Sequence, residues 1–250
     1  MKKLMFFFLL TASLGHGQTI VETHNGKVEG YTEGGIQIFK GIPFAQPPVG
    51  ELRWKAPQPV TDWNGVKACK TFGPSPIQNT PEPFLCWTEE FIAKPEPLSE
   101  DCLYLNVWTP AQKKNETLPV FVWIYGGGLS SGSANCDIYD GLQMAEQGVV
   151  FVSLNYRVGV LGFMAHPELS EESGHNASGN YGFMDQLQGL KWIKENIAAF
   201  GGDPNNVTIA GQSAGSFSVN AQIASPLASG YFDKAICQSG GILGGRLMQD

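Results

Sequence analysis

Alternation between short apolar runs and a helical pattern constrains the fold of this chain more than any other feature. From residue 102 onward, candidate strands lie at 103–108, 120–125, 149–156 and 207–210. The last three are apolar on both faces, as strands covered by helices on both sides are. Strands that alternate with helices are typical of a mostly parallel sheet. The sequence therefore predicts an α/β fold.

The clearest helical pattern lies at residues 180–200. Its apolar side chains recur at the spacing of one helix face, and they are Phe183, Leu187, Leu190, Ile193 and Ile197. Asn180 is a candidate N-cap, and the glycines and proline at 201–204 are expected to end the helix. We expect this helix to pack on the sheet and to lead into the strand at 207–210.

The N-terminal part of the chain follows a different pattern. Residues 26–31 and 36–39 predict two short strands joined at Gly34 and Gly35, which is a β-hairpin. An irregular region follows, because six prolines between residues 71 and 100 exclude a continuous helix or a central strand. A segment of this length is either functional, an interaction surface, or a passive excursion, and the sequence leaves these readings open.

The pentad Gly-x-Ser-x-Gly occurs twice, centred on Ser213 and on Ser130. In a chain with 31 glycines the bare pattern is a weak signal. A nucleophile elbow also needs a strand that ends abruptly before the serine and a helix that begins directly behind it. Ser213 follows the strand at 207–210 and precedes a helical segment at 216–224, whereas Ser130 follows three glycines and precedes no helix. We therefore predict that Ser213 is a catalytic nucleophile.

Backbone N–H groups near Ser213 are candidates for stabilising negative charge on a substrate. Ala214 begins the helix behind the serine, where N–H groups have no partner within the helix. An acyl-transfer intermediate needs at least two such donors. Glycines 126–128 directly follow the strand at 120–125, and glycine lets a backbone approach a substrate closely. A flexible turn is the alternative interpretation of these glycines.

Six segments of the chain carry a resemblance to one known family. They are FKGIPFA at 39–45, LRW at 52–54, EDCLYLN at 100–106, WIYGGG at 123–128, NYRVG at 155–159 and VTIAGQSAG at 207–215. From Gly26 to its end, the chain resembles the carboxylesterase type B family, also called the cholinesterase-like esterases, within the α/β-hydrolase superfamily. The resemblance implies the α/β-hydrolase fold, with a central mostly parallel sheet flanked by helices.

The resemblance also implies an activity and a site. Ser213 would be acylated by small carboxylic esters, and the N–H groups of Gly127, Gly128 and Ala214 would form the oxyanion hole. No metal ion or organic cofactor is implied. Gln212 stands where relatives usually have glutamate, and we expect that difference to matter little. Some members of the superfamily are binding or adhesion modules that have lost the serine, which is the alternative function.

Two charged residues and two aromatic residues have roles that the sequence leaves open. Arg53 and Glu100 form a structural ion pair if they behave as in relatives, and otherwise they are solvated surface charges. Trp87 and Tyr125 are candidates for the entrance to the site, although a core or surface role is favoured for each.

The general base that activates a serine is not evident in the sequence. A serine nucleophile needs a histidine within hydrogen-bond reach, itself oriented by a third group. In α/β-hydrolases the acid and the histidine follow the serine, yet all four histidines, His16, His24, His166 and His175, precede it. The resemblance places a glutamate and a histidine beyond residue 250. We therefore expect an N-terminal part of a catalytic domain that is nearly inactive alone, or else an inactive truncated esterase, with His166 as a less favoured base.

The first residues resemble a secretory signal. Lys2 and Lys3 precede the apolar run at 4–10, and small residues follow at 13–17. We predict a signal peptide at 1–17, a catalytic part at 18–250, and a secreted or periplasmic protein. No later stretch approaches the roughly 18 continuous apolar residues of a membrane span.

Five cysteines follow this segment, and disulfides persist in the compartments that exported proteins enter. Their spacing matches no zinc site. Relatives commonly pair a cysteine just after Phe-Gly-Pro with the one in Glu-Asp-Cys, but here Ser75 and Pro76 follow Phe-Gly-Pro. The pairing among Cys69, Cys86, Cys102 and Cys136 stays open, and Cys237 is expected to be a buried thiol.

Charge limits the classes of partner. The formal net charge is −7, and no basic stripe interleaved with aromatic residues is present, which argues against binding to nucleic acid. The expected partner is a small-molecule ester. The sequence does not indicate an oligomeric state.

Overall fold

The computed structural model describes residues 19–113 and 115–241, so the predicted signal peptide lies outside the described residues and stays a prediction. Within this part, a nine-stranded sheet has the order β1-β2-β3-β7-β9-β8-β10-β11, with β4 paired to β2. Its strands are β1 Thr19–Thr23, β2 Gly26–Glu33, β3 Ile36–Pro43, β4 Val66–Ala68, β7 Tyr104–Thr109, β8 Leu118–Ile124, β9 Val150–Leu154, β10 Gly202–Gln212 and β11 Lys234–Gln238.

The sheet has a parallel block and an antiparallel block. Strands β9, β8, β10 and β11 run parallel to one another, whereas β1, β2, β3, β7 and β9 pair antiparallel. The predicted hairpin is formed by β2 and β3. All residues of β9 are buried, but β8 leaves Phe121 and Trp123 half-buried, because only short elements cover that face. The predicted α/β-hydrolase architecture is confirmed.

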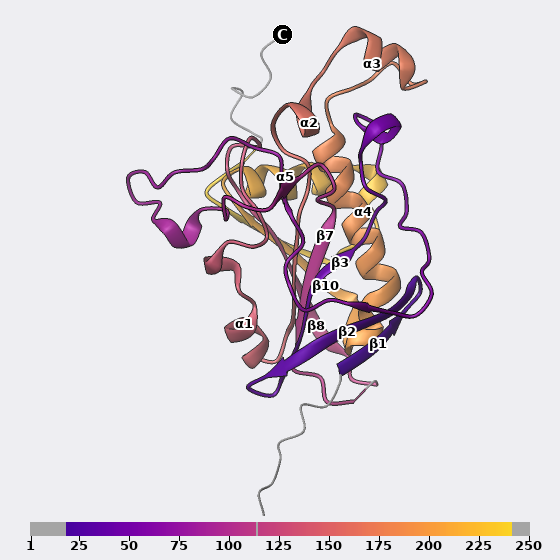
Figure 1. The fold of residues 1–250 in the computed structure, drawn as a ribbon, viewed down its shortest axis with the longest axis vertical. Helices are drawn as coiled ribbons and strands as arrows, with labels where there is room; N and C mark the ends of the chain where they lie inside the picture. Colours follow the sequence, from indigo (N-terminus) through magenta and orange to yellow (C-terminus); the bar gives the residue numbers. More distant parts are fainter. Residues whose placement is uncertain (1–18, 114, 242–250) are drawn as a thin grey trace, which may run out of the picture.

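Helices lie on both sides of the strands, as α1 and α4 do in Figure 1. The predicted helix at 180–200 is α4, which ends in a 3₁₀ turn at Ile197–Phe200, and Gly201 stops it with a φ of 78°. Asn180 has the N-cap position, but its side chain makes no capping hydrogen bond. The helices are α1 Leu142–Glu146, α2 Gly159–Phe163, α3 Pro167–Glu172, α4 Tyr181–Asn196 and α5 Ala214–Ala224. Among the described residues, no helix is both long and apolar enough to cross a membrane.

The core lies between the strands and α4. Its buried side chains from β8, β9, β10 and α4 form one cluster, which includes Val122, Val152, Ile209, Leu190 and Ile193. Burial of such aliphatic side chains supplies most of the favourable free energy of folding. The sheet ends that carry the candidate site are therefore supported by a continuous apolar core.

A buried ion pair joins the segment after β9 to α4. The Arg157 Nε and Nη2 atoms donate to the two carboxylate oxygens of Asp185 at 2.8 and 2.7 Å, and these side chains are 3% and 0% exposed. Burial raises the pKa of the Asp185 carboxyl above its ordinary value, while the hydrogen bonds from Arg157 act in the opposite direction. Each charged group thus gains from its partner hydrogen bonds in place of those that it lost with water on burial.

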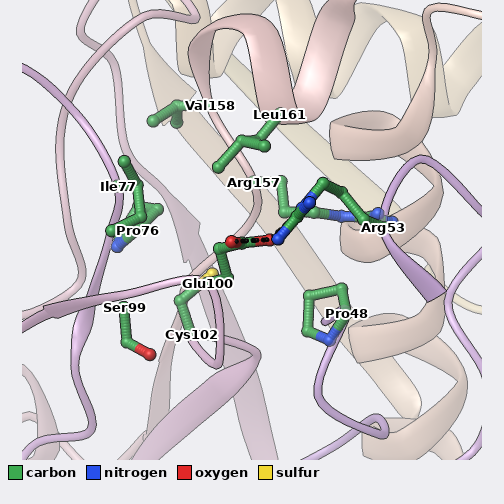
Figure 2. Close-up of a pocket in the computed structure, with 10 residues that line it drawn as sticks. All are labelled: Pro48, Arg53, Pro76, Ile77, Ser99, Glu100, Cys102, Arg157, Val158 and Leu161. Atoms are coloured by element: carbon green, nitrogen blue, oxygen red, sulfur yellow. Dashed lines mark hydrogen bonds and ion pairs between the residues drawn. The ribbon is translucent and has the colours of Figure 1, made fainter. Parts of the chain in front are cut away.

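A second ion pair joins Arg53 to Glu100, and it confirms the structural reading of these residues. The Arg53 Nε and Nη2 atoms donate to the two Glu100 oxygens at 2.5 and 2.6 Å. Hydrogen bonding to Arg53 lowers the pKa of Glu100. Figure 2 shows the pair beside a void of about 10 Å³ that Cys102 and Arg157 also line. This volume is roughly that of one water-sized probe.

The five cysteines are free thiols in the structure, so none of the predicted disulfides is formed. Cys69, Cys102 and Cys136 are buried, whereas Cys86 and Cys237 are exposed. The expectation of a buried Cys237 is wrong, because β11 lies at the edge of the sheet with all five of its residues exposed. In the segment after Phe-Gly-Pro, the Ser75 hydroxyl donates to Ser133 Oγ at 3.0 Å.

We predict that Asp185→Asn lowers the free energy of unfolding by about 3–5 kcal/mol, because it leaves the Arg157 guanidinium buried without a counter-charge. Urea denaturation measures this change. Asp137→Asn is the matched control, since it breaks an exposed pair with Lys94 and should cost less than about 1 kcal/mol. Equal losses in the two variants would contradict the assignment.

Candidate active site

Ser213 lies in a strained turn between β10 and α5. Its φ of 56° and ψ of −122° are rarely adopted by residues with a side chain. The Ser213 N–H donates to the Gln238 carbonyl at 2.9 Å, and its own carbonyl accepts from the Phe217 N–H at 3.1 Å. Among the described residues, no hydrogen bond holds Ser213 Oγ. The structure thus has the strand, strained serine and helix in the predicted order.

Two glycines let the turn come close to the end of β8. A Cβ at Gly215 would lie 2.1 Å from the Ile124 carbonyl oxygen, and one at Gly211 would lie 2.8 Å from the same atom. Both distances are shorter than any normal contact, so a side chain at either position would push α5 away from the sheet. Glycine is therefore required at both ends of the pentad, because the end of β8, the end of β10 and the start of α5 approach one another closely there.

The glycine turn at residues 126–132 lies directly against the elbow. A Cβ at Gly126 would lie 2.6 Å from the Gln212 carbonyl oxygen and 3.2 Å from Ser213 Cβ. Gly127 and Gly128 have φ values of 112° and 64°, in the region that favours glycine. The structure thus brings the two predicted donors, Gly127 and Gly128, to the same place as Ser213.

The Gly127 carbonyl fixes the direction of one donor. It accepts from the N–H groups of Ser130 and Ser131 at 3.1 and 3.0 Å, and from both of their hydroxyls at 3.2 Å. Because a trans peptide points its carbonyl and its N–H in opposite directions, the Gly128 N–H points away from this turn. Ser130, the centre of the second pentad, thus closes a turn and precedes no helix.

Ala214 is the first residue of α5, and it is buried. An N–H in the first turn of a helix has no partner within that helix. It also lies at the positive end of the helix dipole, which favours negative charge. The predicted role of Ala214 as the third donor stays a prediction.

A cavity of about 380 Å³ opens beside Ser213. Its lining comes from the glycine turn with Ser213, from Cys136 and Tyr139, and from part of residues 77–97, which we call the wall segment. The wall segment connects β5 (Ser75–Pro76) to β6 (Leu98–Ser99). It lines the cavity with uncharged side chains, namely Pro81, Phe84, Trp87, Phe91, Ile92 and Ala93.

The wall segment is the proline-rich region for which the sequence left several readings open. Its contribution to the cavity favours the functional reading. Trp87 lines the cavity and contacts Phe91 edge-on, with ring centroids 5.4 Å apart. Tyr125 does not line it, because that ring is buried and stacked on Tyr156 with centroids 4.4 Å apart. Of the two aromatic residues considered for the entrance, Trp87 lines the cavity and Tyr125 has the core role that the sequence favoured.

Three lining residues were not predicted from the sequence to line a cavity. Gln212 lines it beside Ser213, and the expectation that glutamine in place of glutamate matters little stays a prediction. Cys136 and Tyr139 also line it, and they come from a loop that carries no motif. Burial raises the pKa of the Cys136 thiol to about 11, so this thiol is protonated and a poor nucleophile at neutral pH.

None of the histidines in the described residues lines the cavity. His166 caps α3, where its Nδ1 accepts from the Glu168 N–H at 3.3 Å. Because His166 does not line the cavity that holds Ser213, the structure does not support His166 as the base.

A strained serine at the carboxyl ends of parallel strands, with a helix directly behind it and a glycine turn beside it, is the nucleophile-elbow arrangement of the α/β-hydrolase class. Comparison with known proteins supports this class and narrows it. The chain belongs to the carboxylesterase family, whose model matches residues 17–250.

Named relatives are esterases. The chain is 47% identical over 220 residues to the fumonisin B1 esterase of Sphingopyxis macrogoltabida, and the match covers 88% of this chain and 39% of that protein. It is 45% identical over 222 residues to the para-nitrobenzyl esterase of Bacillus subtilis, with 88% and 43% covered.

Solved structures agree. A PNB esterase has a TM-score of 0.81 at 44% identity, covering 90% of this chain and 44% of that one. The Geobacillus stearothermophilus carboxylesterase EST55 has a TM-score of 0.78 at 42% identity, covering 88% and 43%. The chain therefore spans between 39% and 44% of the length of these relatives.

We predict that Gly126→Ala lowers the rate of Ser213 phosphonylation by at least about tenfold, because the added methyl collides with the Gln212 backbone and displaces the elbow. Labelling with a fluorophosphonate measures this rate. Gly148→Ala is the control for backbone strain away from the site: its φ of 86° disfavours a side chain, but a Cβ there meets no atom within 4 Å and the residue does not line the cavity, so the labelling rate should stay normal. A normal rate in Gly126→Ala would contradict the close approach.

Proposed function

We propose that the protein containing this chain is a serine hydrolase that cleaves carboxylic esters through an acyl-enzyme on Ser213. One observation carries the proposal: the strained serine and the glycine turn face the same cavity, with Ser213 Oγ unbonded among the described residues. Membership of the carboxylesterase family supports the reaction class. A non-catalytic binding module would have no need to maintain the strained elbow.

The proposed reaction has two steps. Ser213 Oγ attacks the ester carbonyl, its proton passes to a general base, and the alcohol leaves with that proton. Water then hydrolyses the acyl-enzyme and restores the serine. The N–H groups of Gly127, Gly128 and Ala214 would stabilise the oxyanion in both steps. We propose that the histidine and carboxylate of the triad lie outside the described residues.

The cavity supports a class of substrate. Every residue known to line it is uncharged, and its wall is rich in aromatic rings. Transfer of a charged group into such a site would cost free energy without compensation. We therefore propose that the substrate group seated against the wall segment is uncharged and apolar, as in esters of aryl or alkyl alcohols or acids.

Ser213→Ala should abolish fluorophosphonate labelling of the complete protein and reduce ester turnover by at least about a thousandfold, since no other nucleophile can form the acyl-enzyme. Mass spectrometry of the labelled peptide identifies the modified serine. Ser130→Ala is the control and should lose less than about tenfold, because the Ser130 N–H still holds the Gly127 carbonyl. Labelling that persists in Ser213→Ala, or a wild-type protein that does not react, would sink the proposal.

Trp87→Ala should reduce kcat/KM for an ester with a bulky apolar group about tenfold more than for a small acetate ester, because the indole ring contributes apolar contact to the former. Parallel kinetics on the two esters measure the ratio. Leu85→Ala is the control, since this side chain lies in the wall segment but is 94% exposed. An equal loss for both esters would argue against a role in specificity.

A further inference from the structure

Gln78 links the wall segment to the glycine turn. It lies at the start of the wall segment, two residues after β5. Its Nε2 atom donates to the Gly132 carbonyl at 2.9 Å, and the Gly132 N–H donates to its Oε1 atom at 2.8 Å. Gln78 Nε2 also donates to the Pro76 carbonyl at 3.0 Å. The side-chain amide thus pairs with one peptide position as a neighbouring strand would.

Gly132 in turn lies against the peptide that carries an oxyanion donor. A Cβ at Gly132 would lie 2.6 Å from the Gly126 carbonyl oxygen and 2.5 Å from the Tyr125 ring. The Gly126 carbonyl belongs to the same peptide unit as the Gly127 N–H, so its direction sets the direction of that donor. A displacement of Gly132 would therefore rotate or move the Gly127 N–H.

We propose that Gln78 is a positioning residue that holds the Gly127 and Gly128 donors in the orientation that stabilises the transition state. The inference rests on the proposed esterase function. Gln78 does not line the cavity in the described residues, so its effect passes through Gly132. An oxyanion hole is effective only when its donors are oriented before the charge develops, because reorientation during the reaction would cost free energy.

The Gln78 side-chain amide links the wall segment to the glycine turn that carries the oxyanion donors. The wall segment contributes the apolar side of the cavity, and the glycine turn contributes its polar side. Gln78 belongs to the wall segment and is hydrogen-bonded to the glycine turn. A substrate group that binds against the wall segment therefore meets oxyanion donors that are already correctly placed. No charge is involved, so this coupling should not depend on pH between about 5 and 9.

The fold around Gln78 has other supports, so its loss should leave the chain folded. Ser75 Oγ donates to Ser133 Oγ at 3.0 Å, and Asn135 Nδ2 donates to Ser75 Oγ at 2.9 Å. The Ser75 N–H also donates to the Pro97 carbonyl at 2.9 Å, which closes the base of the wall segment. A positioning role and a purely structural role can therefore be separated.

The test compares variants of the complete protein on a neutral aryl acetate. Gln78→Met keeps the side-chain length and removes both bonds to Gly132, whereas Gln78→Glu keeps the acceptor and loses the donor. Gln78→Met should lower kcat about 10- to 100-fold with KM changed less than about threefold, since a lost donor typically costs about 100- to 1000-fold. Gln78→Glu should fall between Gln78→Met and the wild type.

A second readout reports the oxyanion directly. An aryl trifluoromethyl ketone adds Ser213 Oγ to its carbonyl carbon, the carbonyl electron pair moves to oxygen as the oxyanion, and the serine proton passes to the base. Its inhibition constant should rise in Gln78→Met by about the factor by which kcat falls. The control is Gln58→Ala, since this glutamine is exposed and its amide donates to the Ala56 carbonyl within its own segment, and both quantities should stay unchanged there.

The outcomes are distinct. An unchanged kcat and an unchanged ketone affinity in Gln78→Met would overturn the inference while the wild type remains an active esterase. A loss of kcat that follows the melting temperature, with equal weakening of the ketone and of substrate binding, would show a structural role only and would also overturn it. A wild-type protein without fluorophosphonate labelling or turnover would overturn the proposed function, and this inference with it.

Discussion

The site depends on a close approach of backbone segments with no side chain between them. The end of β8, the end of β10 and the first turn of α5 meet where Gly211 and Gly215 face the Ile124 carbonyl. Because nothing larger than hydrogen fits there, the position of the nucleophile is fixed by peptide units, which are stiffer than side chains. The strain at Ser213 persists because its own N–H and carbonyl are both hydrogen-bonded, to Gln238 and Phe217.

A second set of constraints supports the donors. The Tyr125 and Tyr156 rings stack beneath the glycine turn, and each hydroxyl donates to the other residue's carbonyl, at 3.1 and 2.8 Å. The Gly127 carbonyl is held from within the turn, and Gly132 is held from outside it. Nucleophile and donors are therefore held by separate sets of hydrogen bonds, and the two sets meet at the end of β8, where Gly126 lies against the elbow.

The parts that sequence could predict are those set by neighbouring residues. The α4 helix, the hairpin and the elbow around Ser213 follow from periodicity and from the order of strand, serine and helix. The Gln78 contact joins residues 54 positions apart, and no local pattern encodes such a pair. The exposure of Cys237 follows from the place of β11 in the strand order, which its apolar sequence does not reveal. The burial of Tyr125 likewise depends on a distant partner, Tyr156, which lies just after β9.

The wall segment is attached at its base, and its tip is exposed. Phe84 lines the cavity and is 60% exposed, and the neighbouring Leu85 is almost fully exposed. Residues at such a tip can be exchanged with little effect on folding. For protein engineering, the segment is thus a natural place for combinatorial libraries: variation at the tip would sample new substrate ranges, while the elbow and the glycine turn keep the chemistry constant.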